Sequence, residues 1–313
     1  MRQLVVNQIK DENNRLDKFL SVNIPKYSRS AWHELVDSGL VQVNGRSVKP
    51  HLLVKAGDII TWSNLSRTCK SQGRPKISGV TLPLKIITVE PDYLVINKPA
   101  GLLAHDNFWP PRQPTVVGKL AKKYPEILGL GDNPTRPGLV HRLDKDVSGL
   151  MVVPRTEPMF DSLKRQFKYH TVRKVYTGLV YGVPSHTSGV INFKLSRSTN
   201  GRKMAARPLN QVGKSALTEY EVIRQWTNYS LLKITIKTGR THQIRAHLAA
   251  MGHPLVGDDW YGTNKTKIKN KELGINRVFL VASQLSFMDL ARVRQTFTLR
   301  LPRSMTSFFK TLK

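Results

Sequence analysis

A carboxylate in a short polar turn is the first feature of this sequence that could do chemistry. Asp144 lies in the segment His141–Leu150, between two apolar runs at residues 137–140 and 148–153. Two strands joined by this loop would present the carboxylate at a sheet edge, where a ligand could reach it. The alternative is an ordinary turn aspartate, which is common on protein surfaces. Residues outside this segment have to decide between the two interpretations.

A tyrosine in a predicted strand is the second candidate. Residues 174–182 read as a strand, with Val175, Leu179 and Tyr181 on one face and Tyr176 on the other. A strand tyrosine is usually a core residue or a half-buried edge residue. That interpretation holds for Tyr176 unless another segment places it in a site.

A strand, a turn and a helix carry the third candidate. Residues 230–237 alternate strictly between two faces, which predicts a half-buried strand. The turn at 238–241 leads into a helix that a glycine and a proline end. Arg245 lies in the first turns of this helix beside its apolar stripe, which favours a fixed ion pair; an ordinary surface arginine is the alternative. The turn also offers amides at Arg240 and Thr241 that could seat a phosphate.

These three candidates belong to the longer of two predicted domains. Residues 12–62 form a compact unit by pattern, and residues 63–81 are a polar, basic linker that contains glycine and proline. Residues 82–313 are rich in strands, with helices between them and no regular βα alternation. This pattern predicts an α+β fold with a mixed, mostly antiparallel sheet in place of a doubly wound one.

The shorter domain is predicted to be a small α+β unit. Apolar residues within 16–20 share one helical face, and Ser28 could cap a second helix. A strand at 40–46 runs into an Asn-Gly turn, and residues 54–62 supply a further strand pair around a Gly-Asp turn. Two short helices followed by a small sheet, with Arg15, Lys18, Lys26 and Arg29, resemble the S-four RNA-binding module. A small basic domain that binds no ligand is the alternative.

The charge of the chain indicates a polyanionic partner. Fifty Lys and Arg against 21 Asp and Glu give a net charge of +29, which favours nucleic acid over an anionic membrane surface. No apolar run approaches the roughly 18 residues of a membrane-spanning helix. The single cysteine, Cys69, excludes an internal disulfide and a cysteine zinc cluster, and we expect a cytoplasmic protein. No cofactor motif is present: no phosphate-binding glycine loop, dinucleotide fingerprint or metal triad.

Taken together, the segments resemble the RluA-type pseudouridine synthases, especially members with an S-four-type RNA-binding domain that modify large-subunit ribosomal RNA. The order and spacing of the motifs carry the resemblance, which covers nearly the whole chain. Asp144 and Tyr176 are 32 residues apart, and Tyr176 and Arg245 are 69 apart. The matching segments are Arg15–Leu20, Leu94–Leu102, Arg136–Leu150, Lys174–Tyr176, Arg202–Met204, Thr238–His247 and Gly252–Asp258.

The resemblance implies a role for each candidate. Asp144 would be the catalytic carboxylate, Tyr176 would contact the target base, and Arg245 would pair with Asp144. Arg142 would occupy the space that the base vacates when it leaves its stack. Further expected substrate contacts are His141, Lys98, Arg240, Thr241 and Leu280, and expected RNA contacts are Arg15, Arg29, Lys203 and the basic loops 197–214 and 265–271.

The implied reaction isomerises uridine without a redox change, so no cofactor and no metal are expected. It requires one carboxylate, either as nucleophile at the anomeric carbon or as base at the ribose 2′ position. The expected partner is ribosomal RNA or an assembling large subunit, bound by a monomer without membrane contact. Two alternatives stay open: a transfer RNA substrate, and an RNA-binding assembly factor without catalysis. Three departures from the family pattern, at Val147, Val281 and Met288-Asp289, leave the three main candidates untouched.

Overall fold

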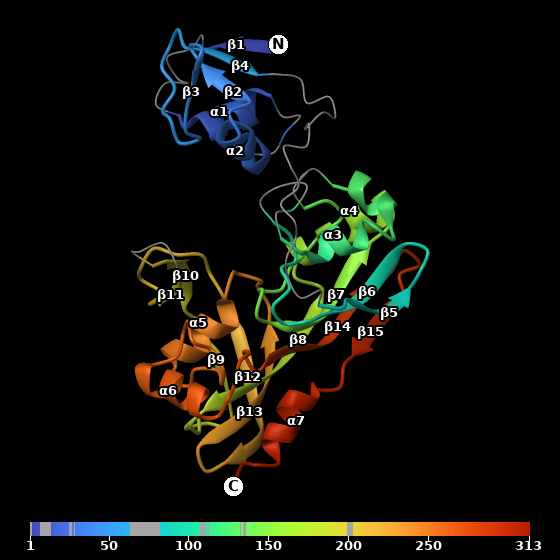
Figure 1. The fold of residues 1–313 in the computed structure, drawn as a ribbon, viewed down its shortest axis with the longest axis vertical. Coiled ribbons are helices and arrows are strands. Elements are labelled where there is room, and N and C mark those ends of the chain that lie inside the picture. The colour runs from blue at the N-terminus through green and yellow to red at the C-terminus, as the bar shows by residue number, and fades with distance from the viewer. Residues whose placement is uncertain are drawn as a thin grey trace. The chain divides into compact units, whose positions relative to one another are not determined.

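The computed structural model describes most of the chain (Figure 1). It divides into two compact units, one of residues 1–80 with 105–138 and one of residues 81–104 with 139–313. The predicted linker at 63–81 and the predicted cap Ser28 lie outside the described residues. The described residues are 2–6, 14–24, 27, 29–62, 82–106, 111, 113–131, 133, 136–198 and 203–313.

The first unit contains a small antiparallel sheet and two helices, α1 (Leu16–Asn23) and α2 (Arg29–Asp37). Asn44 and Gly45 both have positive φ angles, 51° and 76°, and form the predicted tight turn. The strand order is β1-β4-β2-β3, with bounds β1 (Arg2–Val5), β2 (Val41–Val43), β3 (Arg46–Ser47) and β4 (Ile59–Trp62).

The predicted strand pair around Gly57 and Asp58 is wrong. Only its second arm is a strand, β4, and β4 pairs with β1 and β2. The reason is that β1, a segment the sequence did not assign to this sheet, takes the position beside β4. The amide of Gly57 donates to the carbonyl of Val6, so the first arm is a turn against the end of β1.

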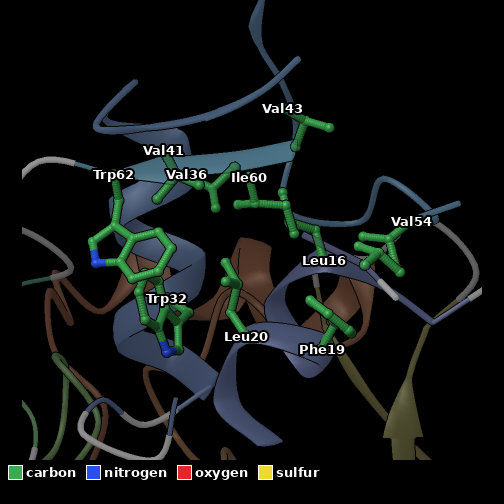
Figure 2. Close-up of a cluster of buried hydrophobic side chains, with 11 residues drawn as sticks. Leu16, Phe19, Leu20, Trp32, Val36, Val41, Val43, Val54, Ile60 and Trp62 are labelled. Atoms are coloured by element: carbon green, nitrogen blue, oxygen red, sulfur yellow. The ribbon is translucent and has the colours of Figure 1, made fainter. Parts of the chain in front are cut away.

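A buried cluster between the small sheet and the two helices holds this unit together, and Figure 2 shows side chains of α1, α2, β2 and β4 meeting in it. Leu16, Phe19 and Leu20 share the buried face of α1, as predicted. The Trp32 ring meets the Trp62 ring edge to face, with centroids 5.7 Å apart. The same unit contains α3 (Val116–Leu120), which Thr115 caps, and the short 3-10 helix Pro125–Gly129.

The second unit is built on a nine-stranded sheet, in the order β5-β6-β7-β14-β8-β13-β12-β9, with β15 paired to β14. Every pairing is antiparallel except that of β7 with β14, which confirms the predicted mixed, mostly antiparallel sheet. The strands are β5 (Lys85–Val89), β6 (Tyr93–Lys98), β7 (Ser148–Pro154), β8 (Arg173–Tyr181), β9 (Ser188–Ile191), β12 (Thr218–Trp226), β13 (Tyr229–Ile236), β14 (Leu280–Met288) and β15 (Arg294–Thr298).

The parallel pair at the centre depends on a glycine. Gly149 in β7 has φ +130°, and a Cβ there would lie 2.5 Å from the backbone of Ala282 in β14. Only glycine allows the two strands to approach this closely. The loop that precedes β7 is thereby fixed next to the middle of the sheet.

Helices cover both ends of this sheet (Figure 1). α4 (Glu157–Lys168) packs Met159 and Leu163 into the cluster around β6 and β7. At the other end lie α5 (Gln243–Ala250) and α6 (Asn264–Glu272), while α7 (Arg303–Phe309) follows β15. A separate hairpin consists of β10 (Lys194–Arg197) and β11 (Met204–Arg207). Among the described residues, no helix is long and apolar enough to cross a membrane.

Candidate active site

Asp144 lies in the loop that leads into β7, in an open pocket. Its side chain is 15% exposed, so a ligand can reach it. The sequence predicted a strand on each side of this loop and a position at the sheet edge. The strand after the loop is confirmed as β7. The strand before it is wrong, because residues 137–140 are turns and coil, and the edge position is wrong, because β7 is a central strand between β6 and β14.

The support under this loop is polar and buried. The Lys98 side chain is 0% exposed, and its ammonium donates to the carbonyls of Pro99, Leu102 and Lys145 at 3.0, 2.7 and 3.0 Å. Burial lowers the pKa of Lys98 to about 7, while the Asp144 and Asp146 charges oppose the change. All three donors of the protonated amine are used, so the predicted substrate contact of Lys98 is replaced by a contact that holds the Asp144 loop.

His141 also supports the loop from below. Its Nε2 accepts the amide proton of Val152 at 3.0 Å, and its ring stacks on Phe167 with centroids 4.5 Å apart. Burial, with a smaller contribution from Lys174, lowers the pKa of His141 to about 3, so the ring is neutral. His141 does not line the pocket, and the predicted substrate contact is not formed by this arrangement.

Arg245 on α5 is the cation nearest to Asp144. Its Nη1 lies 3.7 Å from Asp144 Oδ2 and 3.8 Å from Asp146 Oδ2. Its bidentate hydrogen bonds go to Asp258 and not to Asp144, from Nε at 2.7 Å and from Nη2 at 2.9 Å. The guanidinium therefore uses two nitrogens for its own support and turns the third toward the catalytic candidate.

The Arg245 charge is kept in a buried environment. The residue is 2% exposed, and its guanidinium carbon lies 5.2 Å from the centroid of the Tyr261 ring. Burial alone would lower the pKa of Arg245, but the hydrogen bonds and the charge of Asp258 raise it. Arg245 thus stays protonated, and a fixed positive charge faces Asp144.

Asp258 was part of the matching segment, but the sequence did not single it out. Its carboxylate is fully buried, and Oδ1 also accepts the amide protons of Trp260 and Tyr261 at 3.1 Å each. Asn270 of α6 fixes the same turn, because its Oδ1 accepts from the Gly257 amide and from the Tyr181 hydroxyl. A carboxylate in a glycine turn directly after an apolar run was the available signal.

The entry to α5 is organised by one buried amide side chain. Gln243 Oε1 accepts from the Arg240 amide and the Thr238 hydroxyl, and Nε2 donates to Leu217 and Thr218. The Arg240 amide is therefore already bonded. Of the two amides predicted to bind a phosphate, the prediction for Arg240 is wrong. Arg240 and Thr241 are exposed and do line the pocket.

His242 is a pocket residue that sequence reasoning missed. It begins α5 with a left-handed backbone, φ 52° and ψ 22°, which is uncommon for a residue other than glycine. This conformation points its Nε2 to within 3.9 Å of Asp144 Oδ2, while Nδ1 contacts the Tyr261 hydroxyl at 2.9 Å. Burial lowers the pKa of His242 and the Asp144 carboxylate opposes this, so a neutral ring is the dominant form at pH 7. Its unusual φ was not readable from the sequence.

Tyr176 and Leu280 form the apolar wall of the pocket. Tyr176 lies on β8 and is 8% exposed, and Leu280 lies on the adjacent strand β14. Burial raises the pKa of the Tyr176 phenol, and the Asp144 charge raises it further. The hydroxyl therefore stays protonated at neutral pH and presents a neutral ring beside the carboxylate.

Four cationic positions complete the predicted set. Arg142 is exposed and lines the pocket. Lys203 donates to the carbonyl of Trp260. In the first unit, Arg15 donates two hydrogen bonds to buried Asp17, and Arg29 begins α2, with its side chain outside the described residues.

Two basic segments were expected to be loops. The segment 265–271 is a helix, α6, in which Thr263 caps the N-terminus and Asn270 is buried. The segment 197–214 contains the end of β10 and the whole of β11. The sequence did not predict this helix, because α6 is rich in lysine and has only one buried side chain, so it shows no apolar periodicity. Among the described residues, no group of three or more His, Cys, Asp or Glu could hold a metal ion.

The pocket therefore joins an accessible carboxylate, a fixed cation and a neutral aromatic wall, an arrangement suited to a flat, polar ring attached to a sugar. Comparison with known proteins identifies the class. Residues 92–250 match the family model described as RNA pseudouridylate synthase, and residues 14–60 match the S4 domain.

Full-length relatives make the assignment more specific. A protein named ribosomal large subunit pseudouridine synthase D, from Blochmanniella floridana, is 34% identical over 99% of this chain and 98% of its own length. An RNA pseudouridine synthase from Bacillus subtilis is 32% identical over 100% and 99%. The chain belongs to the RluA family of pseudouridine synthases and carries an N-terminal S4 domain.

A solved structure supports the fold. The human RNA pseudouridylate synthase domain-containing protein 4 aligns with 73% of this chain and 94% of its own, with a TM-score of 0.57 and 24% identity. Membership of the family, and not this likeness of fold, makes the chain an isomerase with RNA as its substrate.

Proposed function

We propose that this enzyme converts uridines to pseudouridine in large-subunit ribosomal RNA and that Asp144 is its catalytic carboxylate. The observation that carries the proposal is the position of Asp144 in the open pocket, 3.7 Å from the nitrogen of Arg245 that Asp258 leaves free. The ribosomal substrate is supported by the S4 domain match and by the name of the relative from Blochmanniella floridana.

The reaction breaks the bond between uracil N1 and ribose C1′, turns the base and joins C5 to C1′. The C5 proton leaves and N1 gains one, so the atoms balance without a redox partner. Asp144 acts either as the nucleophile at C1′ or as the base at the 2′ position, and both routes need the ionised carboxylate. The Arg245 guanidinium supplies a fixed counter-ion that orients the carboxylate and stabilises charge as the bond breaks.

Tyr176 is proposed to hold the uracil by stacking. An aromatic ring stacks on any base, and the contact is worth ~1–3 kcal/mol. The raised pKa of Tyr176 opposes a role as proton acceptor, since the phenol holds its proton more tightly than a free tyrosine does. Arg142 at the pocket entrance is proposed to occupy the place that the extruded uridine leaves in the RNA.

We propose that the two domains predicted from the sequence have different tasks. Residues 12–62 would hold RNA through phosphate contacts, which give affinity without reading sequence. Residues 82–313 would carry out the reaction, and residues 63–81 would join the two. The net charge of +29 supports this, because a polyanion neutralises it.

Pseudouridine mapping tests this proposal directly. Ribosomal and transfer RNA from cells with and without the gene would be compared after chemical labelling of pseudouridine. We expect sites in large-subunit ribosomal RNA to disappear without the gene. Wild type should restore them and Asp144→Asn should not.

A matched control is Asp161→Asn, which removes an exposed carboxylate from α4 and should restore every site. Loss of transfer RNA sites alone would overturn the ribosomal substrate. A rescue by Asp144→Asn would overturn the role of Asp144, and an unchanged pattern would favour a factor that binds RNA without modifying it.

A further inference from the structure

Among the four tryptophans that the structure describes, one stands out by its exposure. Trp260 is 48% exposed, whereas Trp32, Trp62 and Trp226 are at most 9% exposed. We propose that Trp260 is a stacking platform for an unpaired nucleobase of the RNA substrate, adjacent to the target uridine. This inference rests on the proposed function, because it assumes that the target uridine enters the pocket at Asp144.

Trp260 lies one side chain away from the catalytic candidate. Its ring meets the His242 ring edge on, with centroids 5.7 Å apart and planes at 82°. His242 in turn lines the pocket, with Nε2 3.9 Å from Asp144. A strand that delivers a uridine to Asp144 must therefore pass close to Trp260, and its neighbouring bases are unstacked at this point.

The platform is held rigidly from behind. The Trp260 amide donates to Asp258 Oδ1 at 3.1 Å, and the Trp260 carbonyl accepts from Lys203. Asp259 before it accepts from Asn270, and Tyr261 after it donates its amide to Asp258. Because the backbone is fixed before binding, stacking on the ring costs little conformational entropy.

The surroundings of Trp260 favour RNA as the occupant. The Lys203 ammonium donates to the Trp260 carbonyl, and Arg142 and Arg240 are exposed on the lining of the pocket that His242 also lines. An exposed aromatic ring among cations is the arrangement that single-stranded nucleic acid requires, with phosphates on the cations and a base on the ring. A protein partner would have to be acidic to neutralise these positive charges.

The test uses the full chain and a short RNA with 2-aminopurine placed next to the target uridine, because stacking quenches the fluorescence of this base. We expect wild type to quench the probe and Trp260→Ala to lose the quench. Trp260→Ala should also weaken RNA binding about tenfold. Trp260→Phe keeps an aromatic face and should restore most of the quench.

Tyr169→Ala is the matched control, since Tyr169 is 66% exposed at the end of α4 and is not a pocket residue. It should bind and quench as wild type does. Wild-type affinity and quench in Trp260→Ala would overturn the platform and leave Trp260 to a protein partner. The failure of the proposed function has a separate signature, because no pseudouridine would then form in wild type whatever Trp260 does.

Discussion

The same pocket is served by two sets of cations that differ in burial. Lys98 and Arg245 are 0% and 2% exposed, and every described contact they make is with other parts of the protein. Arg142 and Arg240 are exposed on the pocket lining, with their positive charges available to a ligand. The first set will be called the buried cations and the second the rim cations.

The difference indicates two ways in which a positive charge can act. A buried cation acts through its fixed position. Two nitrogens of Arg245 donate to Asp258, and the Lys98 ammonium donates to three backbone carbonyls, one of them in the Asp144 loop. A rim cation works through charge alone, because an exposed guanidinium loses little if its exact position changes. Substitutions in the first set should therefore change the reaction rate and the stability, and substitutions in the second should change RNA affinity.

The largest effect is expected at the carboxylate that both sets surround. Asp144→Asn removes the charge but keeps the size of the side chain, so it should lower the single-turnover rate at least about a thousandfold. RNA affinity should stay within about twofold, because the cations are untouched. Release of a label from uridine C5 measures the first quantity, and filter binding measures the second. A parallel loss of affinity would mean that Asp144 holds RNA and does no chemistry.

The next largest effect is expected at Asp258, which holds Arg245 in place. Asp258→Asn leaves the Arg245 guanidinium without its bidentate partner in a buried site, which should cost about 3 kcal/mol in the free energy of unfolding. Urea unfolding measures this. Glu221→Gln is the matched control, since its ion pair with Lys233 is exposed and should be worth about 0.5 kcal/mol. Equal losses in both variants would remove the distinction between buried and exposed pairs.

Lys98 predicts a pH dependence. Its folded-state pKa of about 7 lies below the ordinary value near ~10.4, so the unfolded chain binds more protons between these two pKa values. The stability of wild type relative to Lys98→Met should therefore rise with pH, by about 2 kcal/mol between pH 7 and pH 9. Urea unfolding of both proteins at several pH values measures the difference. A constant difference would show that Lys98 keeps its proton through this range.

The smallest effect is expected on the rim. Arg240→Gln should weaken RNA binding a few-fold and reduce the slope of log affinity against log salt by about 0.7, the value for one phosphate contact on a single strand. The rate at saturating RNA should not change. Binding titrations between about 50 and 200 mM salt measure the slope. An unchanged slope together with a slower reaction would mean that Arg240 acts through its fixed position, as the buried cations do, and not through its charge.

The sequence predicted the sheet class because alternation and turn residues are local patterns. Strict alternation identified β13, and the glycine after α5 identified its end. Asp144, Tyr176 and Arg245 line one pocket. The order and spacing of the motifs predicted this, because local patterns alone do not show which distant segments meet.

What the sequence could not provide was the bonding of each polar group. Lys98 and His141 were expected to contact substrate, but they lie under the loop, since burial depends on strands that pair across the fold. The sequence did not show that Asp258 is the hydrogen-bond partner of Arg245. Three acidic residues lie near this guanidinium, and only the folded structure distinguishes them. His242 reaches the pocket through a left-handed φ that no periodicity predicts.

One pair of charge-conserving variants tests the contrast between the two sets most directly. Arg245→Lys and Arg240→Lys each keep the positive charge and remove the planar fork. For Arg245→Lys we expect the single-turnover rate to fall about a hundredfold with RNA affinity unchanged, because an ammonium cannot bond Asp258 twice and still face Asp144. Arg240→Lys should match wild type in both quantities. A wild-type rate in Arg245→Lys would contradict the role of the buried set, because charge alone would then suffice.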